Sequence, residues 1–286
     1  MADNDSSSLP QLMSLIEAIA APAGQADVLP YAVYSSVHEQ VIVNVPVIKP
    51  TLILVLQGNK SLEFDGVWEC GRGEFVFLSN RPAIAMRNIP ADSDYLALLI
   101  EFEFDDFEVL PQQGRGSQPL FTGRMDQVLI NTLQQLVEWS HYAPASLWAS
   151  RRRELLLLMY QAGFPQVCQV ALPPTLSHQL YQRISAQLDS APHAEQSATE
   201  LASMLAMSEA TLRRKLAAEH NSLTAIRDSV RMGRGLHLLQ TTMAPIGRIA
   251  ESCGYQSQSR FSERFRQRFG LTPSELRKTR MIESGE

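Results

Sequence analysis

The chain has 286 residues, enough for two domains that each bury a core, and its apolar fraction of 45% is that of an ordinary globular protein. It contains no run of about 18 apolar residues, so we expect no membrane-spanning helix. Taken alone, the net charge of −5 argues against a protein that binds nucleic acid. However, residues 174–286 hold 15 Lys and Arg against 11 Asp and Glu, whereas residues 1–173 hold 10 against 19. The basic half should therefore attract DNA and the acidic half repel it.

The three cysteines, Cys70, Cys168 and Cys253, are far apart and form no CxxC pair, which is not the spacing of a disulfide framework or a zinc site. The first residues are acidic and polar, unlike a signal peptide, so we expect a cytoplasmic protein. Cys70, near a turn, leaves open a thiol that senses electrophiles, although a lone cysteine is more often a small buried apolar residue.

In chain order, apolar residues recur at a helical period over residues 9–21. Short strands follow between residues 29 and 110. Residues 51–56 form a continuous apolar run, typical of a buried strand, and Asp65-Gly66 between residues 60–64 and 67–70 predicts a hairpin with a type I′ turn. Residues 74–78 and 95–104 are further strands. This spacing predicts a small barrel or sandwich.

Three runs in this half, residues 49–60, 67–78 and 94–98, resemble the cupin-like N-terminal sensor of a group of AraC-type regulators. The resemblance implies a β-barrel that is large enough to hold one small-molecule effector. Strand alternation suggests Tyr34, Trp68, Phe75 and Phe77 as lining residues. His38 is the one histidine of residues 29–110, so we expect no metal site there, and we expect no other cofactor.

Two helices are predicted over residues 121–139 and 147–163. The second also resembles the sensor family, in which an Arg-Glu pair opens an apolar helix. Residues 151–153 are three arginines, which indicate either a nucleic-acid patch or, as we favour, a solvated helix start. Residues 155–159 are apolar nearly all round, so the barrel or a second subunit should cover this helix on two sides. The candidate dimer contacts are Trp148, Leu155, Leu158 and Met159.

Residues 197–269 contain the same structural motif twice: a short helix, a tight turn and a second helix rich in arginine. The first copy covers residues 197–216 and the second residues 245–269. Ser197 and Glu200 form a capping box, and Gly254 suits the left-handed residue that ends the first helix of its copy. Ala206 occupies the corresponding position, where a positive φ would cost about 1 kcal/mol.

This tandem, with a connecting helix over residues 222–239 and the ending Phe269-Gly-Leu-Thr-Pro-Ser, resembles the DNA-binding domain of AraC/XylS-type transcription regulators. The resemblance covers about the last hundred residues. Gly233 and Gly235 lie inside the connecting helix, and each should lower the stability of that helix by about 1 kcal/mol relative to alanine. We therefore expect this helix to be less rigid than that of the family. The connecting helix would hold the two recognition helices at a fixed separation, so that they enter successive major-groove segments on one face of DNA.

Residues that face away from the core of each copy are the expected DNA contacts. In the first copy we expect base contacts from Ala210, Arg213 and Arg214, and a phosphate contact from Lys215. In the second copy the base-contacting candidates are Gln258, Ser259, Arg260, Ser262 and Glu263, and the backbone candidates are Arg264, Arg266 and Arg268. Glu263 would either accept from a cytosine amine or pair with Arg260 or Arg266.

The sequence thus predicts an α+β protein: a cupin-like effector and dimerisation domain over residues 1–166, a linker over 167–174, and an all-α domain with two helix-turn-helix modules over 175–282. We expect a sequence-specific transcription regulator, not an enzyme, with double-stranded DNA, a small-molecule effector and a second copy as partners and RNA polymerase as a candidate. One alternative is a ligand-independent regulator whose barrel only dimerises. Another is a cupin-type enzyme, against which the missing histidine cluster argues.

Overall fold

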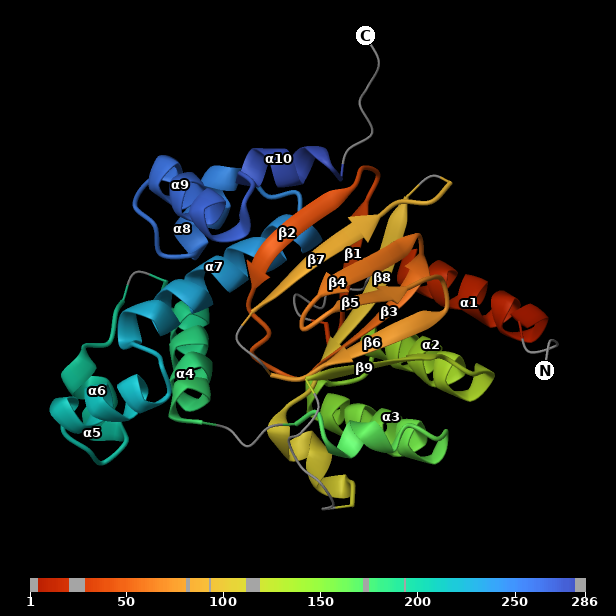
Figure 1. The fold of residues 1–286 in the computed structure, drawn as a ribbon, viewed down its shortest axis with the longest axis horizontal. Coiled ribbons are helices and arrows are strands. Elements are labelled where there is room, and N and C mark those ends of the chain that lie inside the picture. Colours follow the sequence, from red (N-terminus) through yellow and green to blue (C-terminus); the bar gives the residue numbers. More distant parts are fainter. Residues whose placement is uncertain are drawn as a thin grey trace, which may run out of the picture.

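The computed structural model describes residues 5–20, 29–80, 83–92, 94–111, 119–171, 175–192 and 194–280. Two antiparallel sheets lie at the centre, with helices α1, α2 and α3 on one side and the remaining helices on the other (Figure 1). Residues 172–174 and 281–282, which belong to the predicted linker and C-terminal domain, lie outside the described residues.

The first sheet has the strand order β1-β8-β3-β6-β9 and the second the order β2-β7-β4-β5. Their bounds are β1 Ala32–Ser36, β2 Gln40–Val45, β3 Thr51–Gln57, β4 Asn59–Glu63, β5 Val67–Cys70, β6 Glu74–Leu78, β7 Ile84–Ile89, β8 Tyr95–Glu101 and β9 Leu120–Arg124. Within the described ranges no ladder joins the two sheets, so the predicted barrel is not closed and the domain is an open pair of sheets. The mixed α+β class is confirmed.

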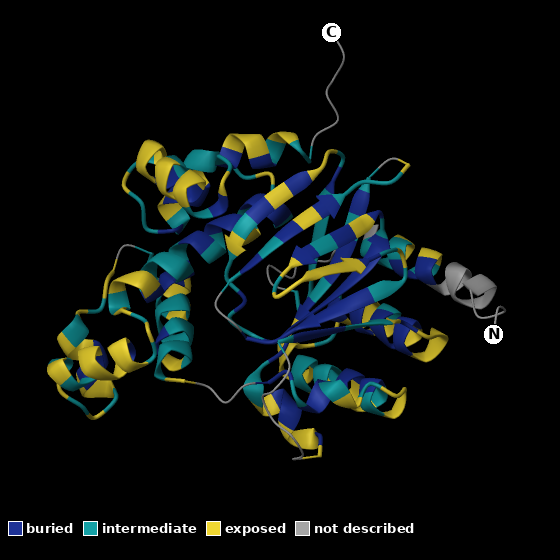
Figure 2. Ribbon diagram, viewed as in Figure 1, coloured by how far each residue is buried: buried dark blue, intermediate teal, exposed yellow. Residues whose placement is uncertain are grey.

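Burial explains why the two sheets differ in sequence. β3 is buried along nearly its whole length because the second sheet covers one face of the first and helices cover the other. Strands of the second sheet alternate between buried and exposed residues because one face meets solvent, as Figure 2 shows. The predicted hairpin is confirmed: β4 pairs with β5, and Asp65 and Gly66 both have positive φ, 49° and 126°.

The helices of the N-terminal half cover the outer face of the first sheet. They are α1 Asp5–Ala20, α2 Gln127–Ser140 and α3 Trp148–Gln161, with short 3-10 turns η1 Phe104–Val109, η2 Ala145–Leu147 and η3 Pro165–Cys168. The helix predicted over 121–139 starts later, because residues 120–124 pair as a strand with β6. Val167, Cys168 and Val170, at the start of the segment predicted as the linker, are buried in the same core as α3.

The C-terminal half consists of seven helices in the described residues: α4 Leu176–Ser190, α5 Ala198–Met204, α6 Glu209–Ala218, α7 Leu223–Thr241, α8 Ile246–Ser252, α9 Gln258–Phe269 and α10 Pro273–Lys278. The capping box of Ser197 and Glu200 forms as predicted. Gly254 and Ala206 both have positive φ, 78° and 52°, so the two turns share one geometry although their residues differ. Gly235 lies where a Cβ would stand 2.7 Å from the Phe261 ring, which explains a glycine inside α7.

Candidate nucleic-acid interface

The recognition helix of the first module is α6. Leu212 and Leu216 are buried in a small core, while Ala210 and Arg213 are exposed. Ser208 caps the helix by accepting a hydrogen bond from the Thr211 backbone N–H. The Arg213 guanidinium pairs with Glu209 one turn earlier, which holds it along the helix surface. Arg214 and Lys215 are exposed beside it.

The recognition helix of the second module is α9, and its three phenylalanines, Phe261, Phe265 and Phe269, are fully buried as predicted. Ser257 caps it by accepting from the Arg260 backbone N–H. The exposed residues at its start are Gln258, Ser259, Arg260 and Glu263, and Ser262 is half-buried. Both recognition helices thus present short polar and arginine side chains at the end where base contacts are expected.

The Glu263 carboxylate accepts a hydrogen bond from Gln267 Nε2 at 3.4 Å, and no ion pair with Arg260 or Arg266 is found in the described part of the chain. The cytosine contact stays a prediction.

The three predicted backbone contacts of α9 separate into two groups. Arg266 is exposed. Arg264 Nε and Arg268 Nη1 lie 2.6 and 3.3 Å from the Asp228 carboxylate of α7, and Arg268 is only 18% exposed. Arg268 is therefore held in the interface between helices, a non-local contact that the helical period of α9 could not reveal.

The effector-pocket residues are not brought together. Phe75 and Phe77 of β6 are buried in the core beneath the helices, where Phe75 meets the Phe121 ring edge-on and Phe77 stacks on it. Trp68 is 37% exposed on β5 and donates its indole N–H to the Phe64 carbonyl. Tyr34 lies on β1, with its hydroxyl 3.4 Å from His237 Nδ1 of α7. The alternation of side chains along a strand predicts which residues share a face of the sheet, but it does not predict which face lines a cavity.

The residues of the predicted dimer helix mostly face their own domain. Leu155 and Met159 are fully buried in the core beneath the first sheet, and Trp148 and Leu158 are half-buried. The prediction of a solvated helix start is wrong for Arg152, because its Nε lies 2.5 Å from the buried Asp106 carboxylate. That pair ties α3 to η1, two segments that no local pattern connects.

A buried polar network between the sheets escaped the sequence interpretation. Lys60 is 2% exposed and donates to Asn88 Oδ1 at 2.8 Å, and Asn88 donates to Gln40 Oε1 at 2.9 Å. Gln240 of α7 also donates to Gln40 Oε1, and Gln40 donates to Thr279 Oγ1 after α10. Burial lowers the pKa of Lys60 to about 7. The sequence signal was a lysine and an asparagine at inward positions of two neighbouring strands, where Lys60 of β4 pairs with Asn88 of β7.

The second module is docked on the N-terminal sheets. The Thr279 carbonyl accepts from the backbone N–H groups of Val37 and His38 at 2.8 and 3.1 Å, and Asn44 donates to the Arg268 carbonyl. One continuous apolar cluster contains Ile42 and Met86 of the second sheet together with the core of α7, α8 and α9. The first module has a separate core.

Comparison with known proteins agrees with this arrangement. A family model described as a helix-turn-helix domain matches residues 201–279. The segment that resembles AraC/XylS-type regulators therefore contains a helix-turn-helix domain. This domain is 37% identical over 98 residues to the HTH-type transcriptional regulator VqsM of Pseudomonas aeruginosa, which is 34% of this chain and 30% of that protein. It is 41% identical over 75 residues to the HTH-type transcriptional regulator GadX of Escherichia coli, which is 26% of this chain and 27% of that one.

The alignments with these curated relatives thus span less than a third of each relative's length. A crystal structure of ToxT from Vibrio cholerae, solved with an unsaturated fatty acid bound, has the same fold over both halves: the TM-score is 0.62 at 14% identity, covering 90% of this chain and 97% of that one. The helix-turn-helix domain is therefore supported by sequence and the N-terminal half by fold. None of the described helices is long and apolar enough to cross a membrane.

Proposed function

We propose that this protein is a sequence-specific DNA-binding transcription regulator. The observation that carries the proposal is the pair of helix-turn-helix modules that α7 joins, each with an exposed recognition helix. Arg213 and Arg214 of α6 and Arg260 of α9 have the fork geometry that reads guanine O6 and N7. One protomer would read an asymmetric site of roughly two turns, because its two modules are not related by symmetry.

DNA binding by the full chain tests this proposal, since the second module shares its core with the sheets. Duplexes selected from a random pool by the wild-type protein serve as probes. Arg213→Ala and Arg260→Ala should each cost about 1–3 kcal/mol of binding free energy and relax specificity at different positions of the site. Arg87→Ala, on the outer face of the second sheet and 55% exposed, is the matched control and should bind like wild type. Equal binding to scrambled duplexes would contradict the proposal.

We further propose that a small-molecule effector modulates DNA binding through the N-terminal domain. The support is the shared fold with ToxT, a protein whose structure was solved with an unsaturated fatty acid bound. A panel of metabolites and unsaturated fatty acids should contain a compound that raises the thermal unfolding temperature and shifts DNA affinity. If stabilisation is absent across the panel, the ligand-independent regulator is favoured. Stoichiometric metal together with turnover would instead favour the cupin-type enzyme.

Self-association, contact with RNA polymerase and action in the cytoplasm belong to the same proposal. Leu155 and Met159 are buried by their own domain, which argues against them as direct dimer contacts. Sedimentation of the full chain, with and without DNA, tests the homodimer.

A further inference from the structure

A groove of about 360 Å³ lies between the two helix-turn-helix modules. Its floor is the first half of α7, with Thr224, Arg227 and Arg231 at helical spacing on one stripe. One wall is Glu195, which precedes the first module, and the other is Tyr255 and Arg264 of the second. The second module, the segment that leads into the first module and the helix that joins the two modules therefore line a single concave surface.

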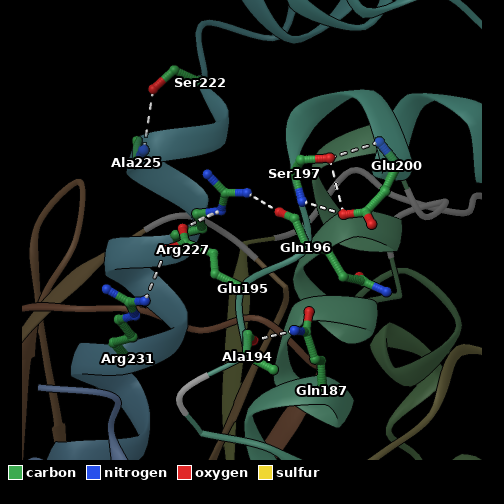
Figure 3. Close-up of polar contacts among 10 residues, drawn as sticks. All are labelled: Gln187, Ala194, Glu195, Gln196, Ser197, Glu200, Ser222, Ala225, Arg227 and Arg231. Carbon is green, nitrogen blue, oxygen red and sulfur yellow. Dashed lines mark hydrogen bonds and ion pairs between the residues drawn. The ribbon is translucent and has the colours of Figure 1, made fainter.

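Positive charge exceeds negative charge in and beside this groove. The Glu195 carboxylate forms ion pairs with two arginines of α7, Arg227 and Arg231 (Figure 3). The distances to Arg227 Nε and Arg231 Nη2 are 2.9 and 3.4 Å. The Asp228 carboxylate forms ion pairs with Arg264 Nε at 2.6 Å and Arg268 Nη1 at 3.3 Å. Each carboxylate is thus shared by two guanidinium groups. Since each carboxylate can neutralise one of them, the cluster keeps a net charge of about +2 for an anion to balance.

The guanidinium groups are held in place but remain accessible. Arg227 also donates to the Gln196 carbonyl (Figure 3), and Arg231 lies over the Tyr255 ring at 6.0 Å. The exposed fractions of the Arg227, Arg231 and Arg264 side chains are 22%, 29% and 49%. A ligand would therefore meet arginines whose rotamers are already ordered, which lowers the entropy cost of binding.

The position of the groove indicates which anion it suits. If α6 and α9 enter successive major-groove segments, the DNA between those segments lies opposite the helix that joins the modules. That stretch presents the sugar-phosphate strands on either side of a minor groove, and phosphates are the groups that arginine binds bidentately. We propose that Arg227, Arg231 and Arg264 bind backbone phosphates of the DNA between the two half-sites. This inference rests on the proposed function and adds Arg227 and Arg231 of α7 to the backbone contact predicted for Arg264, in a region that carries no base specificity.

The contact would set the spacing of the two half-sites and would steepen the salt dependence of binding. Each phosphate neutralised adds about −0.9 to the slope of log K against log salt. Glu195 and Asp228 compete with phosphate for the same guanidinium groups, so DNA would exchange partners with them.

The test uses the full chain, duplexes selected by the wild-type protein, and versions with neutral methylphosphonate linkages between the half-sites. Arg231→Gln should weaken binding roughly tenfold and reduce the salt slope by about one. A single methylphosphonate at the linkage that Arg231 contacts, found by moving the substitution along the DNA between the half-sites, should weaken wild type to a similar extent but weaken Arg231→Gln little further, because both changes remove one contact. Arg231→Lys should retain the salt slope, and Arg87→Gln is the control.

Additive losses from the protein and DNA changes would overturn the inference, as would an equal loss on a duplex that carries a single half-site. Either result would mean that the arginines only hold the modules together. Stabilisation of wild type by inorganic phosphate, without any methylphosphonate effect, would overturn it in favour of a small anion. If no duplex is selected over random sequence, the proposed function itself fails; specific binding with additive losses contradicts only the phosphate groove.

Discussion

The two helix-turn-helix modules have the same local design but depend differently on the rest of the chain. The first closes a small core of its own around Leu201, Leu212 and Leu216, with Leu180 of α4. The second places Phe261, Phe265 and Phe269 in a cluster that continues into the second sheet. The comparison teaches that a repeated motif does not imply equivalent modules. A change in the N-terminal domain would reach α9 directly and α6 only through α4 and α7.

The largest effect should come from truncating the core of each module. Phe265→Ala should destabilise the protein by about 3–5 kcal/mol and lower the stability of the N-terminal sheets together with the second module. Leu212→Ala should cost about 2–5 kcal/mol, confined to the first module. Hydrogen exchange resolves the two regions. If Phe265→Ala left protection of β2 and β7 unchanged, the shared core would be refuted as an energetic unit.

The pH dependence of stability should report the buried network that leads from the sheets to the second module. The folded pKa of Lys60, about 7, is below its ordinary value of 10.5, so the unfolded chain binds this proton more tightly. The cost of burial is complete below pH 7 and is relieved as pH rises toward 10.5. Between those values wild type should gain stability on the order of a few kcal/mol relative to Lys60→Met.

Denaturant unfolding at pH 7 and pH 9.5 measures the Lys60 difference. Lys49→Met is the matched control, because Lys49 pairs with Glu103 in a partly exposed position. Parallel pH profiles for wild type and Lys60→Met would show that the Lys60 amine is not held neutral by burial.

The two turns provide a smaller and symmetric comparison. Gly254→Ala should destabilise by about 1–2 kcal/mol, because its φ is 78° and a Cβ would meet the Pro192 carbonyl oxygen at 2.7 Å. Ala206→Gly should be neutral or stabilise by up to about 1 kcal/mol, since it relieves a positive φ of 52°. Thermal unfolding of both variants gives the contrast. A destabilising Ala206→Gly would mean that the Ala206 methyl packs usefully.

The caps of the recognition helices should give the smallest effect. Ser208→Ala and Ser257→Ala each remove an acceptor for a backbone N–H at the helix start, at a cost of about 1 kcal/mol. Ser208→Ala should raise exchange only in α6, whereas Ser257→Ala should also loosen the docked α9 against β2. Equal and local effects from both would remove the distinction between the modules.

The sequence by itself determined the local features of this protein. The apolar periodicity predicted α5 to α9. The residue types at the helix ends predicted the capping box at Ser197 and the left-handed turns at Ala206 and Gly254, and Asp65-Gly66 predicted the hairpin. These features depend on residues a few positions apart, so a linear pattern contains them. The buried faces of α6 and α9 followed for the same reason, and with them the exposed candidates for base contact.

Only the tertiary structure decided how distant segments meet. Alternation placed Phe75 and Phe77 on one side of β6 but could not say that helices fill that side, because the first sheet is covered on both faces. Arg152 finds Asp106 and Arg268 finds Asp228 only after the chain has folded. The open pair of sheets, the docking of one module and the groove on α7 depend on such long-range contacts, which local propensity does not encode.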